Sequence, residues 1–234
     1  MKRDHSPVLP GDGATDYARY MRTDTLLDLQ RRPEEMIHRD ELLFQVVHQS
    51  TELWLKLAGA ELVEAVARVR AGEPAAAEPL LARATLGVRL VTDQLEMFGH
   101  LSPADFKAMQ PALGKGSGAE SPGWRRVQAA SRQLGRAFTD HLAARGITLS
   151  TLGRPDPTDP VHRLAEALME WDERVSLWRV RHYQTALRVG GHAPAGAEAT
   201  MLAKLIGHRF FPELWQTRLK PADGSVDSSR ASRP

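Results

Sequence analysis

Apolar residues recur at spacings of three and four along most of the chain, which is the periodicity of helices that bury one face. The clearest run covers residues 40–69 and forms one broad apolar stripe. Polar and acidic residues at 38–41 come directly before it, and negative charge is favourable at a helix N-terminus. The pattern therefore predicts a long helix over residues 40–69.

The same periodicity predicts further helices along the chain. One of them starts at a clear signal, with Ser102 as N-cap, Pro103 at the first helical position and Asp105 in the first turn. A glycine-rich break at 114–118 follows it, and residues 146–160 are typical of a linker. The other predicted helices cover 77–100, 122–145, 161–189 and 198–209.

No segment alternates apolar and polar residues as a strand would, so we expect an all-α fold, a helical bundle. The glycine-rich break has neither the spacing nor the preceding strand of a nucleotide-binding loop. Residues 1–14 are typical of an irregular N-terminal arm, and residues 220–234 of a disordered tail. We expect a single domain over residues 1–234.

Composition excludes several kinds of site. The chain has no cysteine, which excludes disulfides, zinc–thiolate sites, cysteine nucleophiles and thiolate-ligated haem. Its formal net charge of +2, from 31 Lys and Arg against 29 Asp and Glu, is too balanced to indicate a nucleic-acid partner. No segment reaches the roughly 18 apolar residues of a membrane span, and the N-terminus has no signal-peptide core. We therefore expect a cytoplasmic protein with no membrane partner.

His48 is one of two histidines, among nine in the chain, that lie inside long apolar helical segments. Phe44 precedes it by one helical turn and Glu52 follows it by one turn, on the same face. Spacing alone favours a core histidine that is bonded to Glu52 and packed by Phe44. The alternative, a functional residue, requires a cavity beside this face. Five other histidines lie in polar or loop contexts and are expected at the surface: His5, His100, His141, His162 and His192.

His182 is the second such histidine, and it lies beside Arg179 and Arg181. A neutral imidazole that projects from a helix along an apolar wall can ligate haem iron, and the two arginines could pair with haem propionates. Spacing alone favours an ordinary buried histidine here too. The histidine spacings match no HExxH or His-x-His zinc motif.

Five segments, taken in order, resemble the tryptophan 2,3-dioxygenase family. The most specific covers residues 40–56 and resembles the family's DExLFxxxHQxxELWxK helix. The other four are Tyr17-x-x-Tyr20-Met21, which resembles YxxYL; Leu113-Gly114 with Ser117-Gly118 and Ser121, which resemble LGxxSGFQS; Leu177-Trp178-Arg179-x-Arg181-His182, which resembles LWRxRH; and residues 210–214, which resemble FFPEL. Five motifs in the same order make chance an implausible explanation.

The resemblance implies the haem-binding helical fold of tryptophan and indoleamine 2,3-dioxygenases, with haem b and O2 as co-substrate. It implies His182 as the proximal iron ligand and His48 as the catalytic residue near the indole nitrogen. The residues that it places at the haem are Leu95, Ser117, Gly118, Trp178 and Arg179. Those that it places at the substrate are Tyr17, Tyr20, Met21, Phe44, Phe106, Gln110 and Leu113. It also implies a homotetramer, or a homodimer, in which the N-terminal arm reaches a neighbour's active site; without the resemblance, Tyr17 and Tyr20 would equally fit the edge of a helix packed on the core.

Three departures from the family pattern concern the amino-acid end of the substrate. The carboxylate-binding arginine of the family is Gln110 here, and a neutral amide cannot replace a bidentate guanidinium. The family's tyrosine four residues earlier is Phe106. The threonine-containing loop that holds the substrate ammonium is replaced by residues 191–198, and the chain is shorter between about residues 127 and 160.

These departures lead to three hypotheses. The first is an oxygenase that acts on tryptophan or a tryptophan derivative in secondary metabolism. It either inserts one oxygen atom, to give a 2-oxindole or hydroxylated product, or cleaves the ring. Insertion of one atom is expected for a divergent member similar to the maremycin-pathway indole oxygenase. The second is a true tryptophan 2,3-dioxygenase that forms N-formylkynurenine. The third is a non-catalytic haem-binding or interaction protein.

Overall fold

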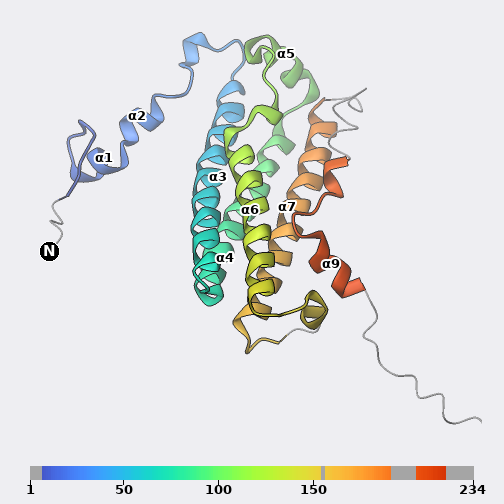
Figure 1. Ribbon diagram of the computed structural model, residues 1–234. Coiled ribbons are helices and arrows are strands. Elements are labelled where there is room, and N and C mark those ends of the chain that lie inside the picture. Colours follow the sequence, from blue (N-terminus) through green and yellow to red (C-terminus); the bar gives the residue numbers. More distant parts are fainter. Residues whose placement is uncertain (1–6, 154–155, 191–203, 220–234) are drawn as a thin grey trace, which may run out of the picture.

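Four long helices lie side by side in the computed structural model, which describes residues 7–153, 156–190 and 204–219 (Figure 1). They are α3 (Glu41–Arg70), α4 (Pro74–Asp93), α6 (Pro122–Ala144) and α7 (Pro160–Gly190). Helix α3 packs against α4 and α6, and α4 packs against α7. The described residues contain no strand, so the predicted all-α class is confirmed.

The turn between α3 and α4 is short because its residues both end one helix and start the next. Gly72 has a φ of 80°, a left-handed conformation that glycine adopts without a steric penalty. Pro74 then takes the first position of α4, where no backbone donor is required. Because the turn is tight, α3 and α4 run antiparallel with their apolar faces in contact.

The core consists of two clusters. The larger one fills the bundle along its length, and Trp171 of α7 is fully buried in it. The indole Nε1–H of Trp171 donates to Ser131 Oγ at 3.0 Å, which satisfies both polar groups inside the core. The smaller cluster lies where α3 begins and α7 ends, and its buried members are Val47, Leu95, Phe98, Leu101, Met109 and Val189.

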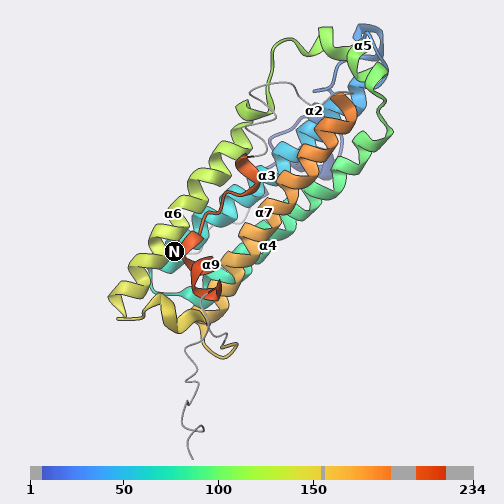
Figure 2. The same ribbon diagram turned by 90° about the vertical axis from the view of Figure 1, so that its right-hand side faces the viewer.

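The smaller cluster is closed by the segment that follows α4. Helix α4 tightens at Gln94 into the 3-10 helix η2 (Gln94–His100) and is followed by α5 (Pro103–Leu113), which lies at one end of the bundle (Figure 2). Ser102 caps α5, because its Oγ accepts the N–H of Asp105 at 3.1 Å. The predicted helix start at Ser102 is therefore confirmed.

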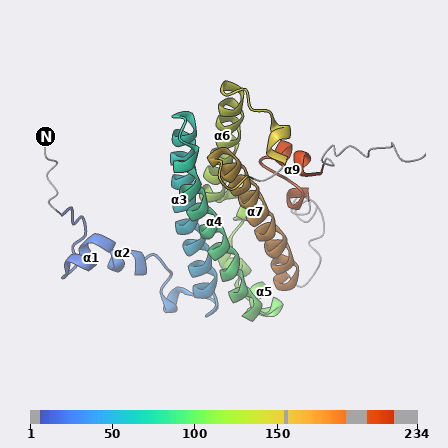
Figure 3. The same cartoon turned by 90° about the horizontal axis from the view of Figure 1, so that it is seen from below.

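The N-terminal arm, α1 (Asp16–Met21) and α2 (Thr23–Leu27), projects away from the bundle (Figures 1 and 3). Neither helix has a buried residue. The arm joins the bundle through η1 (Pro33–Glu35) and the loop that precedes α3. It therefore buries almost none of its apolar surface within its own chain.

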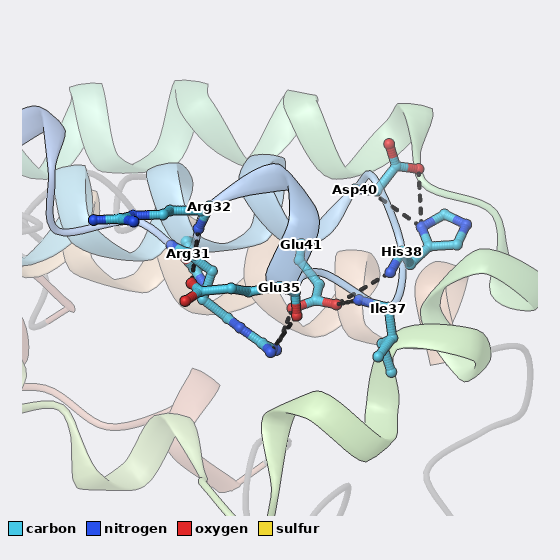
Figure 4. A network of polar contacts seen from close by, with 8 residues as sticks. Arg31, Arg32, Glu35, Ile37, His38, Asp40 and Glu41 are labelled. Atoms are coloured by element: carbon cyan, nitrogen blue, oxygen red, sulfur yellow. Dashed lines mark hydrogen bonds and ion pairs between the residues drawn. The ribbon is translucent and has the colours of Figure 1, made fainter.

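Glu41, at the first position of α3, fixes the root of this arm (Figure 4). Its carboxylate is 1% exposed and accepts the N–H groups of Ile37 at 2.6 Å and His38 at 3.1 Å, and the Arg31 guanidinium at 2.8 Å. Burial alone would raise the pKa of Glu41, but these donors outweigh it and lower the pKa below its usual value. His38 in turn faces Asp105 of α5 at 3.5 Å.

The last described helix, α9 (Pro212–Leu219), is held to α7 by the buried carboxylate of Asp172. This carboxylate accepts the N–H groups of Phe210 at 2.7 Å and Phe211 at 3.0 Å, and Trp215 Nε1–H at 3.2 Å. The ring of Phe211 packs against Gly135 of α6, where a side chain would crowd it. The segment before α9 is thereby wedged between α6 and α7.

Most predicted helices are confirmed, and the boundaries contain the errors. The predicted helix over 77–100 begins earlier, at Pro74, and its last part is the 3-10 helix η2. The predicted linker contains η4 (Leu149–Gly153), and η3 (Gly118–Glu120) follows the glycine-rich break. Residues 204–206 are helical but 207–210 are not, so the predicted helix over 198–209 is wrong at its end.

The start of that predicted helix, the loop 191–198 and the tail 220–234 lie outside the described residues. Among those described, no helix is long and apolar enough to cross a membrane.

Candidate functional site

His48 projects from α3 into a group of aromatic rings. It stacks on Phe44 with ring centroids 4.1 Å apart, and Phe98 of η2 meets it edge-on at 5.8 Å. Its Nδ1 lies 2.7 Å from the backbone carbonyl of Phe44. Because a carbonyl only accepts, Nδ1 carries a proton, and in the neutral form of the ring Nε2 then keeps its lone pair. The packing by Phe44 is as predicted, but the predicted bond to Glu52 is wrong, and so is the predicted core position, because His48 is exposed within its own chain.

His182 projects from α7 and continues a column of stacked rings. Its imidazole lies parallel to the indole of Trp178, with centroids 5.0 Å apart and an interplanar angle of 8°. Burial, and second the charge of nearby His48, lower the pKa of His182. The ring is therefore neutral at neutral pH. Its Nδ1 is buried and has no hydrogen-bond partner among the described residues.

The two histidines come from α3 and α7, and each contacts rings of the smaller core cluster or rings packed against it. Phe44 and Phe106 pack against this cluster with ring centroids 6.2 Å apart, and Trp178 also packs against it. Leu95 is buried in it, and Leu113 is packed on its edge. The structure thus brings together His48, Phe44, Phe106, Leu113, Leu95 and the helix face that carries His182.

The arginines near His182 have partners within the chain. The buried guanidinium of Arg179 donates to the carbonyl of His208 at 2.7 Å and lies over the ring of Phe210. Arg181 pairs with Glu96 of η2, beside a cleft of about 200 Å³ that Leu95 and Arg188 also line. A larger cleft of about 410 Å³, near Glu78 and Arg163, contains neither His48 nor His182. The contact of Arg179 with a propionate stays a prediction.

Other predicted site residues lie at the rim of the cluster or beyond it. Gln110 of α5 is exposed, one turn from Phe106. Ser117 and Gly118 are exposed at η3, where Ser117 Oγ accepts the N–H of Ala119 and its own N–H donates to Glu120. The arm residues Tyr17, Tyr20 and Met21 are exposed on α1 and lie apart from the other site residues of the same chain.

The residues at this site fit a haem in their donor set. A neutral imidazole can ligate iron, and His182 is kept neutral by burial. Its Nδ1 has no hydrogen-bond partner among the described residues, and the wall beside it consists of aromatic and aliphatic side chains. A flat, largely apolar cofactor suits such a wall. His182 and Trp178 would hold the group on one side, and His48 would lie on the other.

Two residues of this site, Phe98 and Trp124, were missed by sequence reasoning, and Glu52 was assigned the wrong partner. Phe98 lies edge-on to the His48 ring, Trp124 of α6 packs tilted against Trp178 with centroids 4.0 Å apart, and Glu52 bonds to the start of α6. No local pattern indicates these contacts, because their partners come from other helices. Helical spacing placed Glu52 on the face of His48, and the resemblance of residues 40–56 to a family helix marked it as part of a motif.

A family model described as tryptophan 2,3-dioxygenase matches residues 4–136, which is more than half of the chain and includes His48. The chain therefore belongs to the tryptophan 2,3-dioxygenase family, and it is an oxidoreductase. The matched segment ends before α7, so it does not include His182.

Curated relatives extend the similarity over nearly the whole chain. Tryptophan 2,3-dioxygenase of Xanthomonas euvesicatoria pv. vesicatoria (strain 85-10) is 28% identical, over 97% of this chain and 97% of its own. The enzyme of the same name from Myxococcus xanthus (strain DK1622) is also 28% identical, over 93% and 94%. The first alignment is 294 positions long, more than the 234 residues of this chain, so that relative has segments that this chain lacks.

Proposed function

We propose that the chain is a haem-dependent oxygenase that uses O2 to oxidise the C2–C3 region of an indole, in tryptophan or a tryptophan derivative. The observation that carries this proposal is that His48 of α3 and His182 of α7 both contact rings of one aromatic cluster, with His182 kept neutral by burial. Haem b, when bound, supplies the binding and activation of O2. The residues of the chain supply the ligand, the orientation of the indole and the exclusion of water.

His182 is the proposed iron ligand. Its ring is oriented by the stacked indole of Trp178, and it is neutral because burial disfavours the imidazolium. A neutral imidazole has the lone pair that binds iron, whereas a protonated one has none. Acid would therefore weaken haem binding through His182 itself.

His48 is the proposed hydrogen-bond acceptor for the indole N–H. The Phe44 carbonyl holds its Nδ1–H, which leaves the lone pair of Nε2 for a donor in the pocket. An indole ring offers one such donor, N1–H. The bond would fix the rotation of the indole about its own plane, so that C2 and C3 face the oxygen.

Phe44, Phe98 and Phe106 are proposed to form the walls that orient the indole ring. Aromatic rings pack against an indole in offset or edge-to-face arrangements and exclude water from it. His48 itself is exposed within its own chain, so the pocket is open on one side. We propose that the arm of a second copy, with Tyr17, Tyr20 and Met21, covers this opening in a homo-oligomer.

The amino-acid end of the substrate is where this chain differs from its family. Gln110 is exposed and neutral in the place of the family's arginine, so it offers no charge-assisted pair to a carboxylate. We propose that the substrate is a tryptophan derivative whose carboxylate is blocked, for example as an amide. The names of the relatives favour a second candidate, the cleavage of free L-tryptophan to N-formylkynurenine.

The visible spectrum of the haem-supplemented protein tests the first step of this proposal. We expect a Soret band that changes on reduction, and its loss or marked change in His182→Ala. His100→Ala, a substitution of an exposed histidine, is the matched control and should leave the spectrum unchanged. If the wild-type protein shows no Soret band, or if His182→Ala keeps the wild-type ferric and ferrous spectra, the assignment of the iron ligand is wrong.

Turnover under 18O2 tests the chemistry. The reduced holoprotein is offered free L-tryptophan and tryptophan amide, and the products are examined by mass spectrometry. Two labelled atoms in a product indicate ring cleavage, and one labelled atom indicates a 2-oxindole or hydroxylated product. Faster turnover of the amide than of free tryptophan supports a blocked carboxylate, whereas the reverse order supports the second candidate. No turnover of either indole contradicts both.

A further inference from the structure

The carboxylate of Glu52 fastens the first turn of α6 to α3. Glu52 lies one turn after His48 on α3, and its Oε2 accepts the N–H of Gly123 at 2.9 Å. Its other oxygen accepts the hydroxyl of Ser121, whose Oγ accepts the N–H of Trp124 at 3.1 Å. A carboxylate at a helix N-terminus is stabilised by the unpaired N–H groups and by the helix dipole. Glu52 therefore holds the start of α6, which Ser121 caps, against α3.

Gly123 makes this approach possible. A Cβ at Gly123 would lie 2.6 Å from Glu52 Oε2 and 2.7 Å from the Cβ of Leu55, closer than real side chains come. Any larger residue at this position would displace the first turn of α6 or the carboxylate. The close contact between α3 and α6 thus depends on both Glu52 and Gly123.

The same turn of α6 carries Trp124, which is the outer ring of the column that ends at His182. Trp124 packs on Trp178 with centroids 4.0 Å apart, and Trp178 lies parallel to His182 at 5.0 Å. Trp178 Nε1 and His182 Nδ1 are both buried, and neither has a hydrogen-bond partner among the described residues. No hydrogen bond of the described chain fixes these two nitrogens, so stacking fixes the orientation of the rings.

We infer that Glu52 is a positioning residue for His182, which acts through the start of α6 and the rings of Trp124 and Trp178. Glu52 bonds to α6 rather than to either histidine. It sets the position of Trp124, and the stacked rings transmit that position to the imidazole. The inference rests on the proposed function in one respect, that His182 is the ligand of the iron.

The first experiment needs no haem. Two indoles in contact give a pair of coupled bands of opposite sign in the circular dichroism spectrum, and Trp178→Phe defines the spectrum without this signal. We expect Glu52→Ala and Gly123→Ala to lose most of the coupled signal. Glu61→Ala, which removes a carboxylate from the same helix, and Gly87→Ala, whose added methyl group would find only ordinary contacts at 3.6 Å and beyond, should keep it.

The second experiment uses the holoprotein. Residues that orient a metal ligand typically change metal affinity by roughly 10- to 100-fold, so we expect haem loss from Glu52→Ala and Gly123→Ala to be faster by about that factor. The iron–histidine stretching band of the ferrous protein should shift in both variants. Glu52→Gln keeps an acceptor oxygen, so its rate of haem loss and its iron–histidine band should lie between those of Glu52→Ala and the wild-type protein.

Several outcomes would overturn the inference. A folded Glu52→Ala protein with the wild-type coupled bands and the wild-type iron–histidine band shows that Glu52 does not position His182. If Glu52→Ala does not fold, Gly123→Ala and Glu52→Gln are compared instead. Wild-type coupled bands and a wild-type iron–histidine band in both of them overturn the inference. If the wild-type chain binds no haem, the proposed function fails, and the circular dichroism comparison alone decides whether Glu52 sets the ring column.

Discussion

The ring of His141 lies in the core, although its polar neighbours in the sequence predicted a surface position. It is 8% exposed on α6, and its Nε2 has no hydrogen-bond partner among the described residues. Burial, and second the charge of Arg145, lower the pKa of His141. The prediction was wrong because neighbours in the sequence point to other faces of the helix, and the buried face is set by α6 as a whole.

The burial of His141 predicts that this residue contributes to the loss of stability in acid. The unfolded chain binds a proton at His141 near the ordinary pKa of 6.5, whereas the folded chain resists it. The free energy of unfolding should therefore be unaffected by this group above that pH and should fall as the pH drops below it. In His141→Leu this part of the decrease in the free energy of unfolding should be absent. Urea unfolding from about pH 5 to 8 measures it. His100→Leu is the exposed control, and equal pH dependence in all three proteins would contradict the prediction.

The partner of His48 shows what residue spacing can and cannot predict. Spacing correctly predicts that Phe44 packs on the imidazole, because residues four apart share a helix face. It equally allows a bond to Glu52, but the Phe44 carbonyl takes Nδ1 instead. Glu52 bonds to Ser121 and Gly123, which are far away in the sequence, and periodicity carries no information about such contacts.

At the scale of elements, the long helices could be predicted well and the short ones could not. Helices α3, α6 and α7 repeat their apolar pattern over many turns, so chance cannot imitate it. Helix α9 spans two turns and owes its place to Asp172, which lies on another helix. The 3-10 helix η2 continues the pattern of α4 and differs from it only in its hydrogen bonds.

The attachment of α9 can be tested at Asp172. In Asp172→Ala the buried N–H groups of Phe210 and Phe211 lose their acceptor, and each unsatisfied group of this kind costs about 1–3 kcal/mol. We expect a lower free energy of unfolding and earlier proteolytic cleavage near residue 210. Asp156→Asn, a change at a carboxylate that serves its own turn, is the control. Unchanged stability of Asp172→Ala would show that the packing of Phe211 alone holds α9.

At the scale of the whole molecule, the arm is the part that one chain does not explain. Tyr17 is 66% exposed and Leu27 is 75% exposed, on helices with no buried residue. Yet the arm's root is held by the fully buried Glu41, so its direction is specified. An ordered arm with an apolar surface is typical of a segment that packs on another molecule. The resemblance to the family predicts that the arm packs on a neighbouring copy, and this stays a prediction.

The proposed exchange of arms predicts that two defective chains can repair each other. A chain that starts at Thr23 lacks Tyr17, Tyr20 and Met21 but keeps its own histidines, whereas His182→Ala keeps the arm but lacks the iron ligand. Each protein alone should turn over indole poorly. When the two are unfolded together and refolded as a mixture, some subunits with an intact His182 should receive an arm from their neighbour.

The mixture should therefore be more active than the sum of the two proteins measured separately, and light scattering should show a smaller assembly for the truncated chain alone. Two controls separate exchange from simple stabilisation. His182→Ala chains that also carry Tyr17→Ser and Tyr20→Ser should give no gain, because their arms lack the covering rings. His100→Ala, which keeps both the arm and His182, should be active on its own, without the truncated chain. Activity that stays additive at every mixing ratio would show that each arm serves its own chain, and the opening beside His48 would then need a different cover.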